Sequence, residues 1–172
     1  MKKPLISIMV GSDSDLLVLS DAVKVLDQFG VSFEITVSSA HRSPERTLRL
    51  VHNYYKNGVK VIIAAAGLAA HLAGVVAAHF PLPVIGVPLK GGALQGIDAL
   101  YSTVQMPPGI PVATVGIDNA KNAGLLAVQI LAVADKALEK KLTTYKKALS
   151  KTVEEKAKKL DAVGLKQYIS EK

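Results

Sequence analysis

The sequence contains no cysteine and no tryptophan, and only 5% of its 172 residues are aromatic. Without cysteine the chain forms no disulfides, offers no thiolate ligands to a metal and has no cysteine nucleophile. The scarcity of aromatic rings argues against a surface on which nucleic-acid bases stack. These absences exclude thiol chemistry and disfavour a single-strand nucleic-acid platform.

A long uninterrupted apolar run is also missing. The most apolar stretch, about residues 59–78, is interrupted by Gly67, His71 and Gly74. It is therefore interpreted as a strand, a turn and a helix, not as a membrane span. Residues 1–4 lead directly into the first expected strand without the layout of a signal peptide. We expect a cytoplasmic protein with no membrane partner.

The net charge of +7 is concentrated at one end of the chain. Residues 136–172 hold eleven lysines and five acidic residues, so the first 135 residues are almost neutral. A surplus of charge confined to a helical tail is usually a solvated face, and nucleic-acid binding is the weaker interpretation. We expect no nucleic-acid partner.

Apolar runs of strand length recur along the chain and alternate with helical patterns. Hydrophobic residues make up 49% of the composition, which suits a well-buried domain. Five runs are expected to be strands: Leu5–Val10, Val31–Val37, Lys60–Ala65, Pro83–Val87 and Val112–Ile117. This alternation predicts an α/β three-layer sandwich, with a five-stranded parallel sheet and helices on both faces. We expect residues 1–142 to form one domain, and residues 143–172 to be a Lys-rich helical extension of it.

A single long helix is expected over Asn119–Leu142. Its first half is apolar on nearly every face. A helix of this kind must be buried, often against another subunit, so self-association is expected.

The turn Ser39–Pro44 lies between an expected strand and an expected helix that starts near Glu45. Ser43 is a plausible N-cap, and Pro44 suits the first position of that helix. Strand-to-helix turns are where an open α/β sheet presents residues to a ligand. Here the turn carries the imidazole of His41 beside the fixed charge of Arg42. An anionic substrate and proton transfer are therefore the first hypotheses.

The loop Gly11–Asp15 follows the first strand and precedes a helix over Leu16–Phe29. Free backbone N–H groups and the positive end of a helix dipole suit a phosphate there, and Ser12 and Ser14 add hydroxyl donors. Asp15 could cap the helix or accept hydrogen bonds from ribose hydroxyls. The alternative is that these residues supply only turn and cap chemistry.

Two further loops offer candidate residues. Small residues from Ala64 to Ala70 allow another molecule to approach the backbone closely. His71, taken alone, fits a hydrogen-bonded structural histidine better than a catalyst. The loop Lys90–Gly96 could be a lid, a phosphate contact or a simple surface connection.

Taken together, the motifs resemble the PurE family, whose members include 5-(carboxyamino)imidazole ribonucleotide mutases of purine biosynthesis. The resemblance covers about residues 5–142. It rests on these stretches, in this order: Gly11–Asp15, Ser39–Arg42, Ala66–Gly67 with Ala70–Leu72, Pro83–Pro88, Tyr101–Pro107 and Asn119–Ala127. Several long motifs in the right order are a specific signal, unlike a lone glycine-rich loop.

The resemblance implies a flavodoxin-like fold, an octamer and an isomerase that needs no cofactor and no metal. Family members move a carboxylate of a ribonucleotide substrate from an exocyclic nitrogen to ring carbon 4. Position by position, the resemblance assigns His41 as the proton shuttle and His71 to orienting the carboxylate or the released carbon dioxide. It assigns the ribose and phosphate to Ser12, Ser14, Asp15, Ser39 and Arg42, and the pocket lining to Ala66, Gly67 and Leu72.

Two other functions stay open at this point. A sister class in the same family carboxylates aminoimidazole ribonucleotide directly with carbon dioxide. A non-catalytic module that binds phosphoribosyl nucleotides could use the same loops. The stretch Ala70–Leu72 together with Arg42 favours the mutase class.

Overall fold

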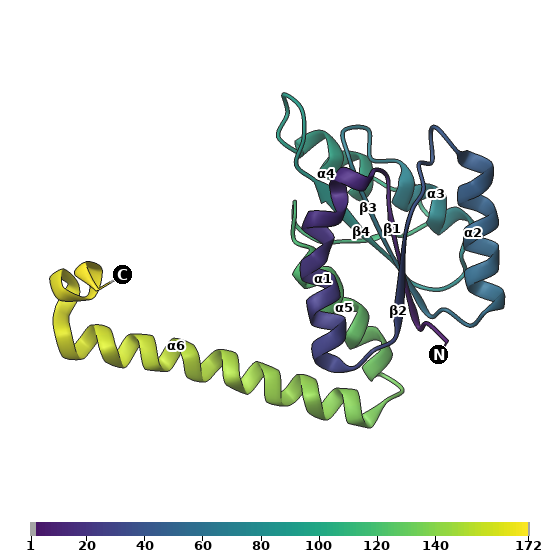
Figure 1. The fold of residues 1–172 in the computed structure, drawn as a ribbon. Helices are drawn as coiled ribbons and strands as arrows, with labels where there is room; N and C mark the ends of the chain where they lie inside the picture. Colours follow the sequence, from purple (N-terminus) through teal and green to yellow (C-terminus); the bar gives the residue numbers. More distant parts are fainter. Residues whose placement is uncertain (1–2, 172) are drawn as a thin grey trace. The chain divides into compact units, whose positions relative to one another are not determined.

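Five parallel strands form one sheet, in the order β2-β1-β3-β4-β5, in the computed structural model, which describes residues 3–171 (Figure 1). The strands are β1 (Ile6–Val10), β2 (Phe33–Val37), β3 (Val61–Gly67), β4 (Val84–Leu89) and β5 (Ala113–Thr114). Every pair of neighbours is parallel, and β1 aligns Ile8 with Ile35 on one side and Ile63 on the other. The predicted α/β class and five-stranded parallel sheet are confirmed.

Helices cover both faces of this sheet. They are α1 (Leu16–Phe29), α2 (Pro44–Lys56), α3 (Leu72–His79), α4 (Ile97–Val104) and α5 (Ala120–Ala132). Figure 1 shows α1 and α5 together on one side of the strands and α2 on the other. The α1 and α5 helices touch where Gly124 meets Ala22 and Val25. On the opposite face α2 packs on α3, and α4 packs on β4. This arrangement is the predicted three-layer sandwich.

The sheet supplies most of the core. All five residues of β1 are buried, as are the first five of β3 and all six of β4, which suits central parallel strands with helices on both faces. On the α2–α3 face, Met9 and Ile62 pack against Val51, Tyr54 and Val76. This packed centre fixes the carboxyl ends of β1, β3 and β4, from which the loops of interest emerge.

The prediction of one helix over Asn119–Leu142 is wrong. The chain leaves the helix after Ala132 and starts a new one, α6 (Lys136–Ser170), because Asp135 acts as an N-cap. Its carboxylate accepts hydrogen bonds from the backbone N–H of Ala137 at 2.8 Å and of Leu138 at 3.1 Å. The N-cap at Asp135 therefore begins a second helix within a stretch that the apolar periodicity predicted to be one.

The predicted strand limits also need correction at the far edge. The fourth strand does not end before Pro88 but continues to Leu89. Pro88 lies beyond the part of β4 that pairs with β5, which involves only Ile85 and Gly86. The fifth strand is two residues long instead of spanning Val112–Ile117.

The chain divides into two compact units, Met1–Leu131 and Ala132–Lys172. The second unit is dominated by α6, whose helical path is interrupted at Gly164 by a φ of 72°. Lysines of α6 pair with Glu139 and Glu155 at 2.7 and 3.7 Å, and their side chains are largely exposed. None of the helices formed by residues 3–171 is both long enough and apolar enough to cross a membrane.

Candidate functional site

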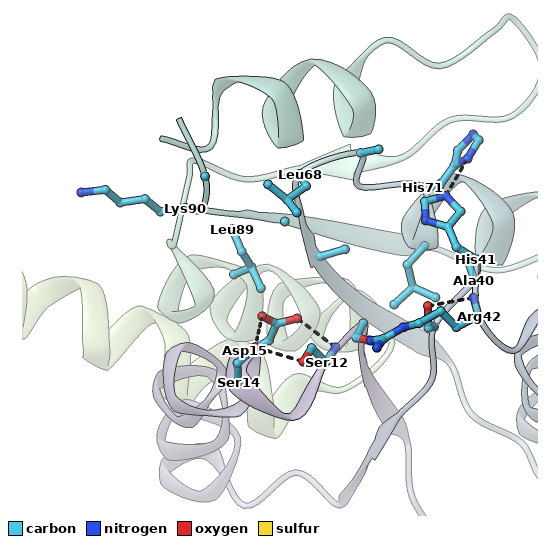
Figure 2. A pocket seen from close by; sticks show the side chains of 18 residues that line it. Ser12, Ser14, Asp15, Ala40, His41, Arg42, Leu68, His71, Leu89 and Lys90 are labelled. Atoms are coloured by element: carbon cyan, nitrogen blue, oxygen red, sulfur yellow. Dashed lines mark hydrogen bonds between the residues drawn. The ribbon is translucent and has the colours of Figure 1, made fainter. Parts of the chain in front are cut away.

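A cavity of about 610 Å³ opens where the loops after β1, β2, β3 and β4 meet (Figure 2). Parallel strands present their carboxyl ends at one edge, so these loops converge although they are far apart in sequence. All ten predicted site residues line this cavity: Ser12, Ser14, Asp15, Ser39, His41, Arg42, Ala66, Gly67, His71 and Leu72. The structure therefore brings the whole predicted set to one place.

The loop after β1 is tied together by its own side chains. The Asp15 carboxylate accepts a hydrogen bond from the backbone N–H of Ser12 at 3.0 Å and one from the Ser14 hydroxyl at 3.3 Å. Asp13 accepts from Ser12 Oγ and from the backbone of Ser14, both at 3.1 Å. Asp13 is absent from the cavity wall, so only Asp15 of the two carboxylates faces it. A phosphate bound here would therefore meet one carboxylate of this loop and not two.

Burial raises the pKa of Asp15 above its ordinary value of 3.8. The hydrogen bonds from Ser12 and Ser14 oppose this by favouring the carboxylate, and the nearby charge of Asp13 adds to the increase. Asp15 is thus an acceptor whose ionised form has no cationic partner among residues 3–171. It suits hydroxyl groups, such as those of a sugar, because they donate to it without adding negative charge.

The loop after β2 is fixed at both ends. The Ser38 backbone donates to Val10 at 2.8 Å, and its buried hydroxyl contacts that of Thr47 at 2.8 Å. Ser43 occupies the predicted N-cap position of α2, but its hydroxyl donates to the carbonyl of Ser39 at 3.0 Å instead of capping the helix. These bonds hold the loop that carries His41 and Arg42.

Ser39 and Arg42 together form a surface of donors. Ser39 Oγ accepts a hydrogen bond from the backbone N–H of Arg42 at 3.1 Å, which leaves its own O–H proton free to donate to a ligand. The Arg42 guanidinium makes one long contact, 3.4 Å, with the carbonyl of Gly11. Figure 2 shows the Arg42 side chain extending toward Ser12. Both serine loops and the guanidinium therefore meet at one end of the cavity.

Two imidazoles lie at the other end. His41 Nε2 and His71 Nδ1 are 3.4 Å apart, and their ring centroids are separated by 5.5 Å with a tilt of 58°. His71 occupies the residue before α3, and its backbone carbonyl accepts from Val75. His71 is hydrogen-bonded, as a structural histidine would be, but its partner is a second imidazole from another loop of the cavity, so its role stays a prediction. Each ring can fix the tautomer of the other.

The wall between these two ends is built from small and apolar residues. A side chain at Gly67 would come within 3.4 Å of the carbonyl of Leu89, so the two strands approach closely there. Leu68 also lines the cavity, although sequence reasoning did not single it out. It has a left-handed backbone, with a φ of 55°, and its side chain rests against Gly92. A leucine within an apolar stretch of sequence gives no indication of a left-handed backbone.

The loop after β4 lines part of the cavity, and its action as a lid or a phosphate contact stays a prediction. Leu89, Lys90, Gly91 and Gly92 line the cavity. The backbone N–H of Lys90 donates to the carboxylate of Asp118 at 2.8 Å, which anchors the loop. Figure 2 shows the Lys90 ammonium pointing away from the serines and histidines. In this conformation Arg42 is the cation that faces the donor end.

The arrangement combines an anion-binding end with a titratable end. Hydroxyls, a guanidinium and the Asp15 carboxylate gather on one side, an imidazole pair lies on the other, and small residues also line the cavity. Such a cavity can hold a phosphorylated sugar and transfer a proton at the far side of the molecule. Among residues 3–171, no three histidine or acidic side chains gather as metal ligands.

Comparison with known proteins gives a consistent set of relatives. The family model described as AIR carboxylase matches residues 5–152. The N5-carboxyaminoimidazole ribonucleotide mutase of Pyrococcus horikoshii is 54% identical over 170 residues, covering 99% of this chain and 96% of that protein. The mutase of the same name from Thermotoga maritima is 49% identical, covering 98% of this chain and 99% of that protein.

Longer relatives and a solved structure extend this picture. The phosphoribosylaminoimidazole carboxylase of Saccharomyces cerevisiae is 52% identical over 172 residues, but the chain corresponds to only 30% of that protein. The crystal structure of Treponema denticola PurE aligns with a TM-score of 0.85 at 30% identity, covering 91% of this chain and 98% of that chain.

Proposed function

Because this chain belongs to the AIR carboxylase family, over residues 5–152, we propose that it is a mutase of purine biosynthesis. It converts N5-carboxyaminoimidazole ribonucleotide into 4-carboxy-5-aminoimidazole ribonucleotide. The relatives that the chain matches from end to end are named as mutases, which favours this reaction over direct carboxylation. The observation that carries the proposal is the convergence of His41, His71 and Arg42 on one cavity.

The substrate's phosphate binds at the donor end of the cavity. Arg42 offers a planar fork of N–H donors, which suits two phosphate oxygens at once, and Ser39 keeps a hydroxyl proton to donate. Ser12 and Ser14 now point their hydroxyls at carboxylates and at each other, so ligand binding redirects those protons. Asp15 accepts from the ribose hydroxyls.

The aminoimidazole ring lies along the small-residue wall. Ala66 and Gly67 allow the flat ring to approach the backbone, and Leu72 closes the apolar side. This placement directs the ring atoms toward the two histidines. A pocket of this kind also retains carbon dioxide between the two halves of the reaction by excluding water.

His41 carries one proton through the reaction. As the bond between the exocyclic nitrogen and the carboxylate breaks, carbon dioxide leaves and the nitrogen takes a proton from the imidazolium of His41. Carbon 4 then attacks the retained carbon dioxide, and neutral His41 removes the hydrogen from carbon 4. The imidazolium is restored, so the proton count balances and no cofactor enters.

His71 positions the reacting groups. Its Nδ1 lies 3.4 Å from His41 Nε2, close enough to orient that ring before the substrate arrives. When the substrate binds between them, His71 donates to the carboxylate or to carbon dioxide. The resemblance to the family also leads us to propose a cytoplasmic homo-octamer as the working form.

One assay separates the candidate functions. The purified protein is incubated with N5-carboxyaminoimidazole ribonucleotide without ATP or bicarbonate, and then with aminoimidazole ribonucleotide plus bicarbonate. A mutase turns over the first mixture at catalytic protein concentration. A carboxylase acts only on the second. A binding module binds both ribonucleotides and converts neither, and either of these last two results overturns the proposal.

A further inference from the structure

The segment Leu89–Gly92, which lines the cavity, begins at the end of β4, beyond the reach of the neighbouring strand β5. In the part of the chain that the structure describes, β5 pairs with β4 only as far as Gly86, whose carbonyl also accepts from the Val115 N–H at 3.1 Å. Backbone groups left unpaired at a strand edge need other partners. On this edge the next groups are the Pro88 carbonyl and the Lys90 N–H, because Pro88 has no N–H of its own.

Asp118, in the connection between β5 and α5, supplies both of these partners. Its backbone N–H donates to the Pro88 carbonyl at 2.9 Å, and its carboxylate accepts from the Lys90 N–H at 2.8 Å. A residue of a parallel strand opposite Leu89 would make the same two bonds with its own N–H and carbonyl. The Asp118 carboxylate therefore replaces a strand carbonyl, and the two bonds hold the chain on both sides of Leu89.

Asp118 also has a backbone conformation that side chains seldom adopt. Among residues 3–171, three residues other than glycine have a positive φ: Leu68, Gln95 and Asp118, at 55°, 52° and 56°. All three lie in the loop after β4 or contact it. A Cβ at Gly92 would lie 2.8 Å from the Leu68 side chain, and the Gln95 amide donates to the Gly92 carbonyl at 2.9 Å. Strained conformations persist where the surroundings hold them, and they gather at ligand sites.

The position of Leu89–Gly92 sets the width of the cavity beside the small-residue wall. Leu89 pairs with Gly67 of β3, and its carbonyl would lie 3.4 Å from a Cβ at Gly67. Gly67 is one of the residues along which we place the aminoimidazole ring. Outward movement of the segment would open the cavity beside that ring and admit water. Asp118 does not itself line the cavity, so it acts through the segment that it holds.

We propose that Asp118 is a positioning residue for the reaction: its carboxylate holds Leu89–Gly92 in place, and carbon dioxide is thereby kept in the cavity until carbon 4 captures it. The inference rests on the proposed function, because only that reaction requires carbon dioxide to be retained. When the segment is loose, the bond between the exocyclic nitrogen and the carboxylate still breaks, the nitrogen takes the proton of His41 and carbon dioxide escapes. Carbon 4 keeps its hydrogen, His41 regains a proton from water, and the product is aminoimidazole ribonucleotide.

Asp118→Gly tests the proposal, because it removes the carboxylate but keeps the backbone N–H and tolerates a φ of 56°. With N5-carboxyaminoimidazole ribonucleotide as substrate and a blank without protein subtracted, formation of the 4-carboxy product should slow by about tenfold. The share of consumed substrate released as aminoimidazole ribonucleotide should rise. KM should change little, because Ser39 and Arg42 are unaltered. Asp118→Asn keeps a side-chain acceptor and tolerates the left-handed backbone, so it should keep the wild-type product ratio.

Asp135→Gly is the matched control, because the Asp135 carboxylate also accepts hydrogen bonds from backbone N–H groups but lies outside the cavity. It should keep the wild-type product ratio. An unchanged rate and ratio in Asp118→Gly, or equal release from Asp118→Asn, overturns the positioning role and leaves the proposed reaction standing. A wild type that converts nothing overturns both.

Hydrogen exchange of the Lys90 amide tests the anchoring without any variant. The amide should be protected in the wild type, because it donates to the Asp118 carboxylate. Exchange at the rate of an unstructured chain overturns the proposal whatever the turnover.

Discussion

At Asp15, the property that favours ligand binding also lowers the stability of the protein. Its carboxylate faces the cavity and accepts hydrogen bonds from Ser12 and Ser14. In the part of the chain that the structure describes it has no cationic partner, and burial raises its pKa. An acceptor kept partly desolvated is ready for hydroxyl donors. The ionised Asp15 carboxylate lowers the free energy of unfolding of the protein, because burial of a charged group costs stability.

Replacing Asp15 should change how stability depends on pH. A raised pKa means that the folded chain holds this proton more tightly than the unfolded chain, so the contribution to stability is greatest below pH 3.8 and is lost as pH rises through the folded-state value. Asp15→Asn removes that titration. In urea unfolding, the variant should therefore gain stability relative to the wild type between about pH 4 and about pH 7.

Asp21→Asn is the control with the opposite sign. The hydrogen bond from Lys24 lowers the pKa of Asp21, so its contribution is present above the unfolded-state pKa and is lost as the pH falls. This variant should lose stability relative to the wild type as the pH rises toward and through 3.8, which is a lower range than the one for Asp15. If both variants follow the same trend, the burial of Asp15 does not govern its titration.

The site residues were predictable to different extents. Ser12, His41 and Arg42 stand in strand-to-helix turns, where the sequence pattern itself points to ligand contact. For His71 the local pattern indicated no ligand contact; only the family resemblance assigned it a role, and its position 3.4 Å from His41, thirty residues away in sequence, is visible only in the structure. Leu68 was missed because its left-handed backbone arises from how the loops after β3 and β4 meet.

At the scale of elements, the closest approach on the α1–α5 face depends on one glycine. A Cβ at Gly124 would lie 3.0 Å from the Ala22 carbonyl oxygen and 3.1 Å from Val25 Cβ. Both atoms are fixed by α1, so neither can move aside cheaply. Gly124 therefore sets how close the two helices lie.

Gly124→Ala should destabilise the protein by about 1–3 kcal/mol in denaturant unfolding, because overpacking outweighs the helical preference of alanine. Gly74→Ala is the matched comparison in α3. There the added Cβ meets only the flexible end of Met106, at 3.1 Å from its sulfur. This second change should be neutral or slightly stabilising. Equal effects of the two variants on the free energy of unfolding would show that α1 and α5 can move apart at little cost to admit the added methyl group.

The elements were predicted well where the pattern was strong and poorly where a cap intervened. Leu16–Phe29 appears at the expected limits, since Gly30 ends it with a φ of 72°. The helix expected over Asn119–Leu142 is divided because Asp135 binds two backbone N–H groups of its own. Apolar periodicity cannot reveal such a break, because both helices contain alanine and leucine in similar spacing.

In the whole molecule, the cavity and most of the positive charge belong to different units of the chain. The cavity belongs to the unit Met1–Leu131, while the lysine surplus belongs to the unit Ala132–Lys172. The predicted boundary between the domain and its extension, after residue 142, remains a prediction. The two compact units divide after Leu131, eleven residues earlier. The basic surplus therefore says little about the substrate.

Removal of residues 143–172 tests this separation. The shortened chain should elute from a polyanion column at a lower salt concentration, because it loses eight lysines but only four acidic residues and is therefore less positively charged. Its retention should fall without a change in the affinity of the cavity for ribonucleotide, measured by calorimetry. Undiminished retention would place the basic surface elsewhere in the chain.

The central claim is that one imidazole carries a proton between two atoms of the same heterocycle. His41→Asn should lower the turnover of N5-carboxyaminoimidazole ribonucleotide by about a hundredfold or more while leaving its binding largely intact. His52→Asn is the matched control. The His52 ring also faces a second histidine, His79, with their ring centroids 6.2 Å apart, but His52 lies outside the cavity. The control should keep wild-type turnover. Near wild-type turnover by His41→Asn would contradict the account.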